Sequence, residues 1–278
     1  MLIITHFNPD IDAICAVWLL KKFGLQEYKN ARVDFVPAGQ TFEGKPVDSD
    51  KQIVHVDTGL GKFDHHQFKD DSICASSLVL DSIKKQLGSQ DWEILERLVN
   101  IVCEMDHFKE CLWPQADDDR YQFLLPDILN GLKIDNELDD QGLVDFGSVC
   151  LTGIFQSIRS KLSAEEELAK GIKIQTIWGK TLFVDSGNPE TLHLGQKMGY
   201  NVVVRNDSKT GLLKIGARPD LTLNLEKIFL MLKKKEPDVN WFFHSSGRLI
   251  LNGSSKNPKM VPSQLSQTEL IKIIKNIN

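Results

Sequence analysis

The stretch that decides the fold lies near the start of the chain and reads Thr5-His6-Phe7-Asn8-Pro9-Asp10-Ile11-Asp12. It follows the apolar run Met1–Ile4 and precedes a second apolar run, Ala13–Leu20, that leads to Gly24. The first run predicts a short buried strand, and the second predicts an apolar-faced helix that ends at the glycine. One histidine and two aspartates therefore lie in a strand-to-helix turn. Such turns, at the carboxyl end of an α/β sheet, are the usual place for a ligand site.

Two interpretations of this turn stay open from its residues alone. Imidazole and carboxylate groups suit divalent ions such as Mn, Fe, Co or Zn. Alternatively, Asp10 and Asp12 only cap the helix, because a helix N-terminus favours negative charge. The remaining motifs of the chain are needed to choose between a metal site and a simple cap.

Length and composition limit the class of protein. A chain of 278 residues fits one large domain or two moderate ones, and 41% hydrophobic with 26% charged residues is ordinary globular composition. The net charge of −5 argues against a wide contact with long nucleic acid, but not against short strands or nucleotides. There is no CxxC pair among the five cysteines, no leader before the first strand and no apolar run of membrane-spanning length. We therefore expect a soluble, cytoplasmic protein with reduced thiols.

Strands and helices alternate through the predicted first half. The expected strands are 33–38 and 53–57, separated by a polar loop at 39–51. The expected helices are 76–88, with Ser76 or Ser77 as N-cap, followed by 91–105, 143–161 and 164–170. This alternation predicts an α/β domain built on a parallel sheet.

The composition shifts near Gly171, and a second, smaller α+β domain is predicted beyond it. We place the two domains at residues 1–172 and 173–278. The expected elements of the second domain are strands at 181–184, 201–204 and 212–218, helices at 223–235 and 266–277, and a hairpin with its turn at 245–248. The strand at 201–204 is expected to stop there because Arg205-Asn206-Asp207 turns the chain.

Candidate metal ligands stand in four separated stretches, each at the end of a predicted strand or helix. They are His6 with Asp10 and Asp12, then Asp57, then the triplet Asp64-His65-His66, and finally Asp106. Carboxylates and imidazoles in this mixture are what two divalent ions about 3.5–4 Å apart require. Such ions lower the pKa of a water held between them, so that a hydroxide able to attack phosphorus exists near neutral pH.

Two further histidines lie beside these candidate ligands. His55 shares a strand face with Asp57, and His107 follows Asp106 directly. We interpret both as packed or supporting imidazoles, with direct metal contact as the open alternative.

In their order along the chain, these stretches resemble the four motifs of DHH-type phosphoesterases. The motifs are His6-x-x-x-Asp10-x-Asp12, the strand-end Asp57, the triplet Asp64-His65-His66, and Asp106. The resemblance implies a DHH domain with a linker helix and two ions, of which one is held by His6, Asp10 and Asp57 and the other by Asp12, Asp57, His65 and Asp106. It also implies that Asp57 bridges the ions, that His66 contacts phosphate or protonates the leaving oxygen, and that Asp64 orients an imidazole. Manganese is the metal expected, with Mg, Co or Fe as alternatives.

The second half resembles the DHH-associated domain of the same family, although the Gly-Gly-Gly-His run of that domain is absent. Instead, residues 243–250 resemble the His-x-Ser-Gly segment of the MYG-type exonuclease branch. The residues expected to bind substrate phosphate are Arg218, His244, Ser246, Gly247 and Arg248, because arginine forks suit phosphate and a glycine turn exposes backbone N–H groups. The alternative is an ordinary polar hairpin.

The leading hypothesis is a metal-dependent phosphodiesterase that hydrolyses short oligonucleotides or small nucleotides with a two-metal-activated hydroxide. The alternative is a small-phosphate hydrolase, such as a polyphosphatase, pyrophosphatase or nucleotide phosphatase. The Ser-Arg-Lys-Lys run of DHH-type pyrophosphatases does not occur here, which disfavours the pyrophosphatase. A third class is a non-catalytic nucleotide- or metal-binding protein. Neither a long duplex nor a membrane is an expected partner, and a homodimer is compatible with the sequence.

Overall fold

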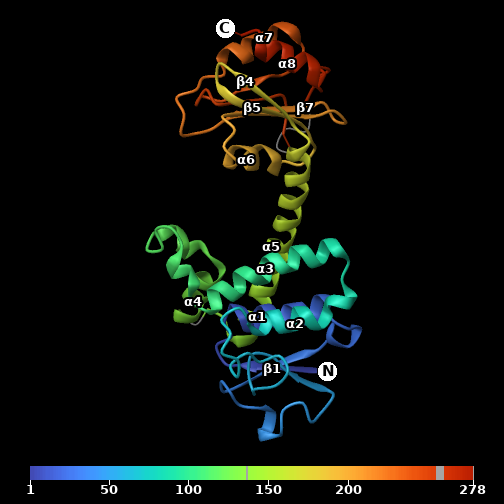
Figure 1. The fold of residues 1–278 in the computed structure, drawn as a ribbon, viewed down its shortest axis with the longest axis vertical. Helices are drawn as coiled ribbons and strands as arrows, with labels where there is room; N and C mark the ends of the chain where they lie inside the picture. The colour runs from blue at the N-terminus through green and yellow to red at the C-terminus, as the bar shows by residue number, and fades with distance from the viewer. Residues whose placement is uncertain (136, 255–259, 278) are drawn as a thin grey trace. The chain divides into compact units, whose positions relative to one another are not determined.

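The computed structural model describes residues 1–135, 137–254 and 260–277. The chain divides into two compact units, Met1–Ile158 and Arg159–Asn278. The division falls inside the long helix α5 (Asp140–Ala169), drawn in yellow-green in Figure 1. Among the described residues, no helix has the length and apolar character needed to cross a membrane.

A three-stranded parallel sheet, in the order β2-β1-β3, belongs to the first unit. Its strands are β1 (Leu2–His6), β2 (Arg32–Val36) and β3 (Ile53–His55). Ile3 of the central strand pairs with Val33 on one side and Val54 on the other, and its side chain is fully buried. Because the strands are parallel, the residues that follow β1 and β3 meet at one edge of the sheet. The predicted parallel-sheet α/β domain is confirmed.

The helices of the first unit pack around the buried helix α1. They are α1 (Ile11–Phe23), α2 (Ala75–Ile83), α3 (Ser89–Asp106), α4 (Leu125–Ile134) and the first part of α5, with short 3-10 turns at Gln26–Tyr28, Phe42–Gly44, Lys84–Gln86, Lys109–Leu112 and Asp119–Phe123. Figure 1 shows α1 and α2 side by side next to β1, with α3 beyond them. Every residue of α1 from Ile11 to Leu20 is buried, so the helix is enclosed on all sides rather than on one face.

The second unit contains a mixed six-stranded sheet in the order β4-β5-β6-β7-β9-β8. Its elements are β4 (Ile172–Thr176), β5 (Gly179–Asp185), α6 (Glu190–Lys197), β6 (Val202–Asp207), β7 (Leu212–Ala217), α7 (Glu226–Lys235), β8 (Phe242–Phe243), β9 (Leu249–Leu251) and α8 (Gln267–Lys275). Side chains alternate across β6: Val202 and Val204 pack in the core with α7 and α8, whereas Val203 packs with α6 on the other face. The predicted second α+β domain is confirmed.

Three expectations about element ends and continuity are wrong. Helix α2 begins at Ala75 with Cys74 as its N-cap residue, not at Ser76 or Ser77, because the Asp12 carboxylate accepts the free N–H groups of its first turn. The break expected near residues 161–164 does not exist, since Ser163 bonds to Glu167 inside a continuous α5 instead of capping a new helix.

Strand β6 runs past residue 204 to Asp207. Arg205 pairs with Lys214 and Asn206 with Leu213 across the antiparallel ladder to β7, so backbone pairing overrides the polar turn-like composition. Three elements, α4, α6 and β4, were not expected at all. Strand β4 lies at the edge of the sheet with mostly exposed side chains, and an edge strand of this kind carries little hydrophobic pattern.

Candidate metal centre

The opening motif supplies both a helix cap and a possible ligand at the same residue. Asp10 is the N-cap of α1, and its Oδ1 accepts a hydrogen bond from Ala13 N at 3.0 Å. Its other oxygen, Oδ2, lies 3.9 Å from His6 Nε2. The two interpretations of this turn are therefore compatible, because each carboxylate oxygen has a separate environment.

His6, the last residue of β1, presents one ring nitrogen to the cluster. Its Nδ1 lies 2.8 Å from Phe7 O and donates to it, so Nε2 is the nitrogen that faces Asp57 Oδ2 at 3.2 Å. This is the arrangement in which a backbone carbonyl fixes the tautomer of a metal-binding histidine. Burial opposes the imidazolium, but the bonds to Asp57 and Phe7 outweigh it and raise the pKa of His6 to about 9. A cation would take the place of the Nε2 proton.

Asp57 lies between two imidazoles. Its Oδ2 faces His6, and its Oδ1 is 3.4 Å from His65 Nε2, while the side chain is only 2% exposed. The backbone of Asp57 is left-handed (φ 55°), a conformation that costs energy for most residues and recurs at functional sites. Asp57 N donates to Phe63 O at 2.9 Å, and this bond closes the loop that joins Asp57 to the triplet Asp64-His65-His66. Burial works against the carboxylate, yet the bonds to His6 and His65 lower its pKa.

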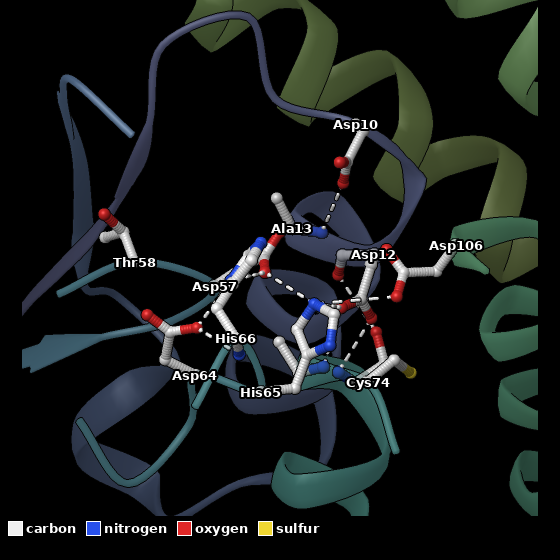
Figure 2. Close-up of polar contacts among 12 residues, drawn as sticks. Asp10, Asp12, Ala13, Asp57, Thr58, Asp64, His65, His66, Cys74 and Asp106 are labelled. Carbon is white, nitrogen blue, oxygen red and sulfur yellow. Dashed lines mark hydrogen bonds and ion pairs between the residues drawn. The ribbon is translucent and has the colours of Figure 1, made fainter. Parts of the chain in front are cut away.

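Three carboxylates surround the His65 ring. Figure 2 shows Asp57 on one side of the ring and Asp106 on the other, with Asp12 behind. His65 Nε2 lies 3.5 Å from Asp106 Oδ2 and 4.0 Å from Asp12 Oδ2. The hydrogen bond to Asp57, with the charges of the other carboxylates, raises the pKa of His65 to about 9. Burial and mutual repulsion raise the pKa of Asp106 to about 7 and that of Asp12 to about 6.

The first turn of helix α2 holds the Asp12 side chain through hydrogen bonds. The fully buried carboxylate accepts hydrogen bonds from Ala75 N at 2.6 Å and Ser76 N at 2.8 Å, and Ser76 Oγ donates to the backbone carbonyl of Asp12. The partial positive charge at the start of a helix favours an ionised carboxylate here. From the sequence, Ser76 is interpreted only as a cap residue, because its contact with Asp12 spans 64 positions of the chain.

The outer two residues of the triplet form a separate pair. Asp64 is buried and accepts hydrogen bonds from Leu60 N at 2.7 Å, His66 N at 3.0 Å and His66 Nδ1 at 2.7 Å. The His66 side chain is 60% exposed, and its Nε2 is the nitrogen not engaged by Asp64. This pair appears on the left of Figure 2, with Asp64 below the His66 ring. Asp64 thus orients an accessible imidazole, as the family resemblance implies.

The donor set fits divalent cations. Asp57 Oδ1 and Asp106 Oδ2 are buried, and their partners among the described residues are imidazole nitrogens at 3.4–3.8 Å, which is too loose for a well-formed hydrogen bond. Ligand atoms lie within 4.8 Å of one another in three groups, which are His6/Asp10/Asp57, Asp57/His65/His66 and His65/Asp106/His107. Carboxylate oxygens and imidazole nitrogens this close together suit Mn, Fe, Co or Zn. A bound cation would also relieve the repulsion among the carboxylates.

The neighbouring histidines differ in their surroundings. His55 Nε2 accepts a hydrogen bond from Phe42 N at 3.1 Å, and burial lowers the pKa of this imidazole, which suits a supporting role. His107 Nδ1 lies 3.0 Å from Cys103 O and 3.4 Å from Asp106 Oδ2. His107 therefore lies next to a candidate ligand. In the sequence, its position directly after Asp106 is the feature that points to this location.

The expected substrate residues of the second unit form one local cluster. His244 Nδ1 lies 2.9 Å from Ser246 Oγ, and Gly247 turns the hairpin with a left-handed φ of 70°. Arg248 Nε is buried with no hydrogen-bond partner among the described residues. Arg218 forms a two-pronged ion pair with Asp220, at 2.9 and 2.5 Å. The phosphate-binding role of these residues stays a prediction, and for Arg218 it requires phosphate to replace Asp220.

Comparisons with known proteins give distant likenesses to solved structures. No protein-family model matches the chain, and no curated protein matches it. Among solved structures, it is similar to the pGpG-specific phosphodiesterase PggH from Vibrio cholerae, with 13% identity and a TM-score of 0.30 over 90% of this chain and 91% of that one. It is also similar to the DHH domain of a member of the s1p family of ribosomal proteins, with 10% identity and a TM-score of 0.32 over 98% and 85%. A putative family II inorganic pyrophosphatase from Methanococcus jannaschii matches with 13% identity and a TM-score of 0.21 over 99% of both chains. Likenesses this weak do not carry an activity over to this chain.

Proposed function

We propose that this protein is a DHH-type, metal-dependent phosphodiesterase that hydrolyses short oligonucleotides or small nucleotides. The observation that supports it best is the position of Asp57, whose two oxygens face His6 and His65 separately, with further carboxylates next to each imidazole. A carboxylate so placed is suited to bridge two ions. The ligands also follow one another along the chain in the order of the four DHH motifs.

Two divalent ions, manganese first among them, fit this centre. One would be held by His6, Asp10 and Asp57, and the other by Asp12, Asp57, His65 and Asp106. When bound, such a pair lowers the pKa of a water and stabilises the charge that develops on phosphoryl oxygens. The bonds from α2 hold the Asp12 carboxylate in one orientation, and the Phe7 carbonyl does the same for the His6 ring.

His66 is the proposed proton donor to the leaving oxygen. Its Nδ1 proton is bonded to Asp64, so Nε2 is the atom that exchanges a proton with substrate. The exposure of its side chain leaves it accessible to a bound ester. Because Asp64 is buried and also accepts two backbone N–H groups, it fixes the ring without itself contacting substrate.

In the second unit, we propose that His244, Ser246, Gly247 and Arg248 bind phosphate. The left-handed turn at Gly247 and the buried Arg248 Nε without a partner support this assignment. Arg218 contributes once phosphate displaces Asp220 from its guanidinium.

The test is hydrolysis by purified, manganese-loaded protein of short RNA, short DNA, pyrophosphate, polyphosphate and nucleoside monophosphates, measured side by side. We expect the oligonucleotides to be the fastest substrates and the Asp57→Ala variant to lose turnover. Faster release of phosphate from pyrophosphate, polyphosphate or nucleoside monophosphates would favour the small-phosphate hydrolase instead. A metal-loaded protein that cleaves none of these substrates would contradict the proposal.

A further inference from the structure

A cavity adjoins the metal-ligand cluster in the first unit. It has a volume of about 210 Å³, and Asp10 and Asp106 form part of its wall. The lining also contains Glu110 from the turn after α3, and Asn130 and Lys133 from α4. Because the cavity shares two candidate ligands with the metal centre, a group inside it would lie next to a phosphate held at that centre.

Apolar side chains and charged groups of both signs line the cavity. Met105 and the fully buried Leu129 contribute apolar surface. Glu110 Oε2 is sheltered from solvent, and no described residue donates a hydrogen bond to it. Lys133 Nζ donates to Asn8 O at 3.1 Å, and an ammonium carries two further N–H groups. A ligand with N–H donors beside a carbonyl oxygen would satisfy both groups.

The charges of the wall favour a neutral occupant over a phosphate. Asp10, Asp106 and Glu110 contribute three carboxylates against the Lys133 ammonium; cations at the metal centre would offset the first two, and the charges of Glu110 and Lys133 then balance. The size also points to a single ring system, since pockets for whole drug-sized ligands are about 300–1,000 Å³. A flat, neutral heterocycle therefore fits the volume, the apolar side chains and the balance of charges.

We propose that this cavity binds the nucleobase next to the scissile phosphate and selects guanine. The Watson–Crick edge of guanine presents N1–H and N2–H donors, which suit Glu110, beside an O6 acceptor, which suits Lys133. Adenine presents an unprotonated N1, and cytosine an unprotonated N3, where the carboxylate requires a donor. The assignment of this base to a substrate rests on the proposed phosphodiesterase function.

Nucleosides without phosphate test the cavity directly. We expect manganese-loaded wild-type protein to bind guanosine at least about tenfold more tightly than adenosine, measured by titration calorimetry, because a buried carboxylate facing a lone pair loses a charged hydrogen bond. Inosine lacks the 2-amino group and is expected to fall between them. Equal binding of guanosine and adenosine, or no binding of either, would overturn the proposal.

The matching variant is Glu110→Gln, with Glu93→Gln as control. Glu93 lies on exposed α3 surface and pairs with Arg97, away from the cavity. We expect Glu110→Gln to lower the affinity for guanosine about tenfold and to leave the affinity for adenosine within about twofold of wild type. The control variant should change neither affinity. An unchanged guanosine-to-adenosine ratio in a folded Glu110→Gln protein would contradict the base assignment. Hydrolysis of oligonucleotides without any base preference would overturn this inference while leaving the phosphodiesterase function intact. Absent hydrolysis would overturn the phosphodiesterase function and the placement of the base beside a scissile phosphate, whereas guanine binding by the cavity is decided by the nucleoside titrations.

Discussion

Asp57 is the residue on which the candidate centre depends most. It occupies a left-handed backbone position directly after β3, is almost fully buried, and turns one oxygen to each of two imidazoles. An asparagine tolerates the same backbone conformation but has only one carbonyl oxygen to offer. The residue type is therefore dictated by the need for two acceptors, not by the turn.

Replacing Asp57 with Asn tests the bridge. We expect kcat to fall by about a hundredfold or more, because several kcal/mol of charge stabilisation depend on correctly held ions. Manganese stoichiometry, measured on dialysed protein, should fall with it. Asp70→Asn is the control, because among the described residues this exposed carboxylate accepts its hydrogen bonds from the neighbouring Ser72. An Asp57→Asn protein that keeps two bound ions and full turnover would rule out the bridging role.

Asp64 offers a second test at the same scale. Asparagine at this position cannot accept all three of its hydrogen bonds, so we expect Asp64→Asn to lose about 1–3 kcal/mol of unfolding free energy. Urea denaturation measures this loss. The His66 ring, followed by ¹⁵N NMR, should lose its fixed Nδ1–H tautomer because the carboxylate that accepts this proton is gone, and kcat should fall about 10–100-fold with little change in KM. A purely structural role for Asp64 would leave the tautomer of His66 unchanged.

At the scale of elements, α1 carries the first motif and its position depends on close packing with α5. A side chain added at Gly147 of α5 would place its Cβ 2.7 Å from Ile14 Cγ2, so α5 can approach α1 only where a glycine stands. Trp18 Nε1 also donates to Thr152 Oγ1 at 3.0 Å across the same contact. The two aspartates at the start of α1 are thereby fixed by helix packing behind them.

Gly147→Ala should therefore destabilise the protein although alanine favours helices. We expect a loss of about 1–3 kcal/mol from overpacking, compared with a gain of up to about 1 kcal/mol for Gly153→Ala on the same helix. Nothing lies within 4 Å of a Cβ at Gly153, which makes it the matched control. Chemical denaturation measures both. Equal stability changes in the two variants would show that the α1–α5 approach is not constrained by this glycine.

At the scale of the whole molecule, the cluster links stability to pH and metal. In the metal-free fold the pKa values of His6 and His65 are about 9, and those of Asp12 and Asp106 are about 6 and 7, all above their ordinary values. The folded chain therefore holds more protons than the unfolded chain between about pH 5 and pH 9, and its free energy of unfolding falls as pH rises through this range. The lowered pKa of Asp57 acts in the opposite direction only below about pH 4.

Thermal unfolding checks this linkage. In the presence of a chelator, Tm should decrease steadily from about pH 6 to about pH 9.5, because the histidines lose their stabilising protons. Added Mn should raise Tm at the alkaline end, and increasingly so with concentration, because ions that bind only the folded state replace those protons. A metal-free Tm that is constant or rises over this interval would contradict the assigned pKa directions.

The sequence alone determined the order and chemistry of the motif residues, because short buried strands and apolar helices leave strong local patterns. The local sequence patterns therefore sufficed to predict β1 and α1 and to name the candidate ligands. What surrounds them was decided only in three dimensions. The bonds from α2 to Asp12, the glycine contact between α5 and α1, and the cavity lined by Glu110 and Lys133 all join segments far apart in the chain. No local pattern encodes such contacts, since they arise only when the parallel sheet brings its loops to one edge and the helices pack behind it.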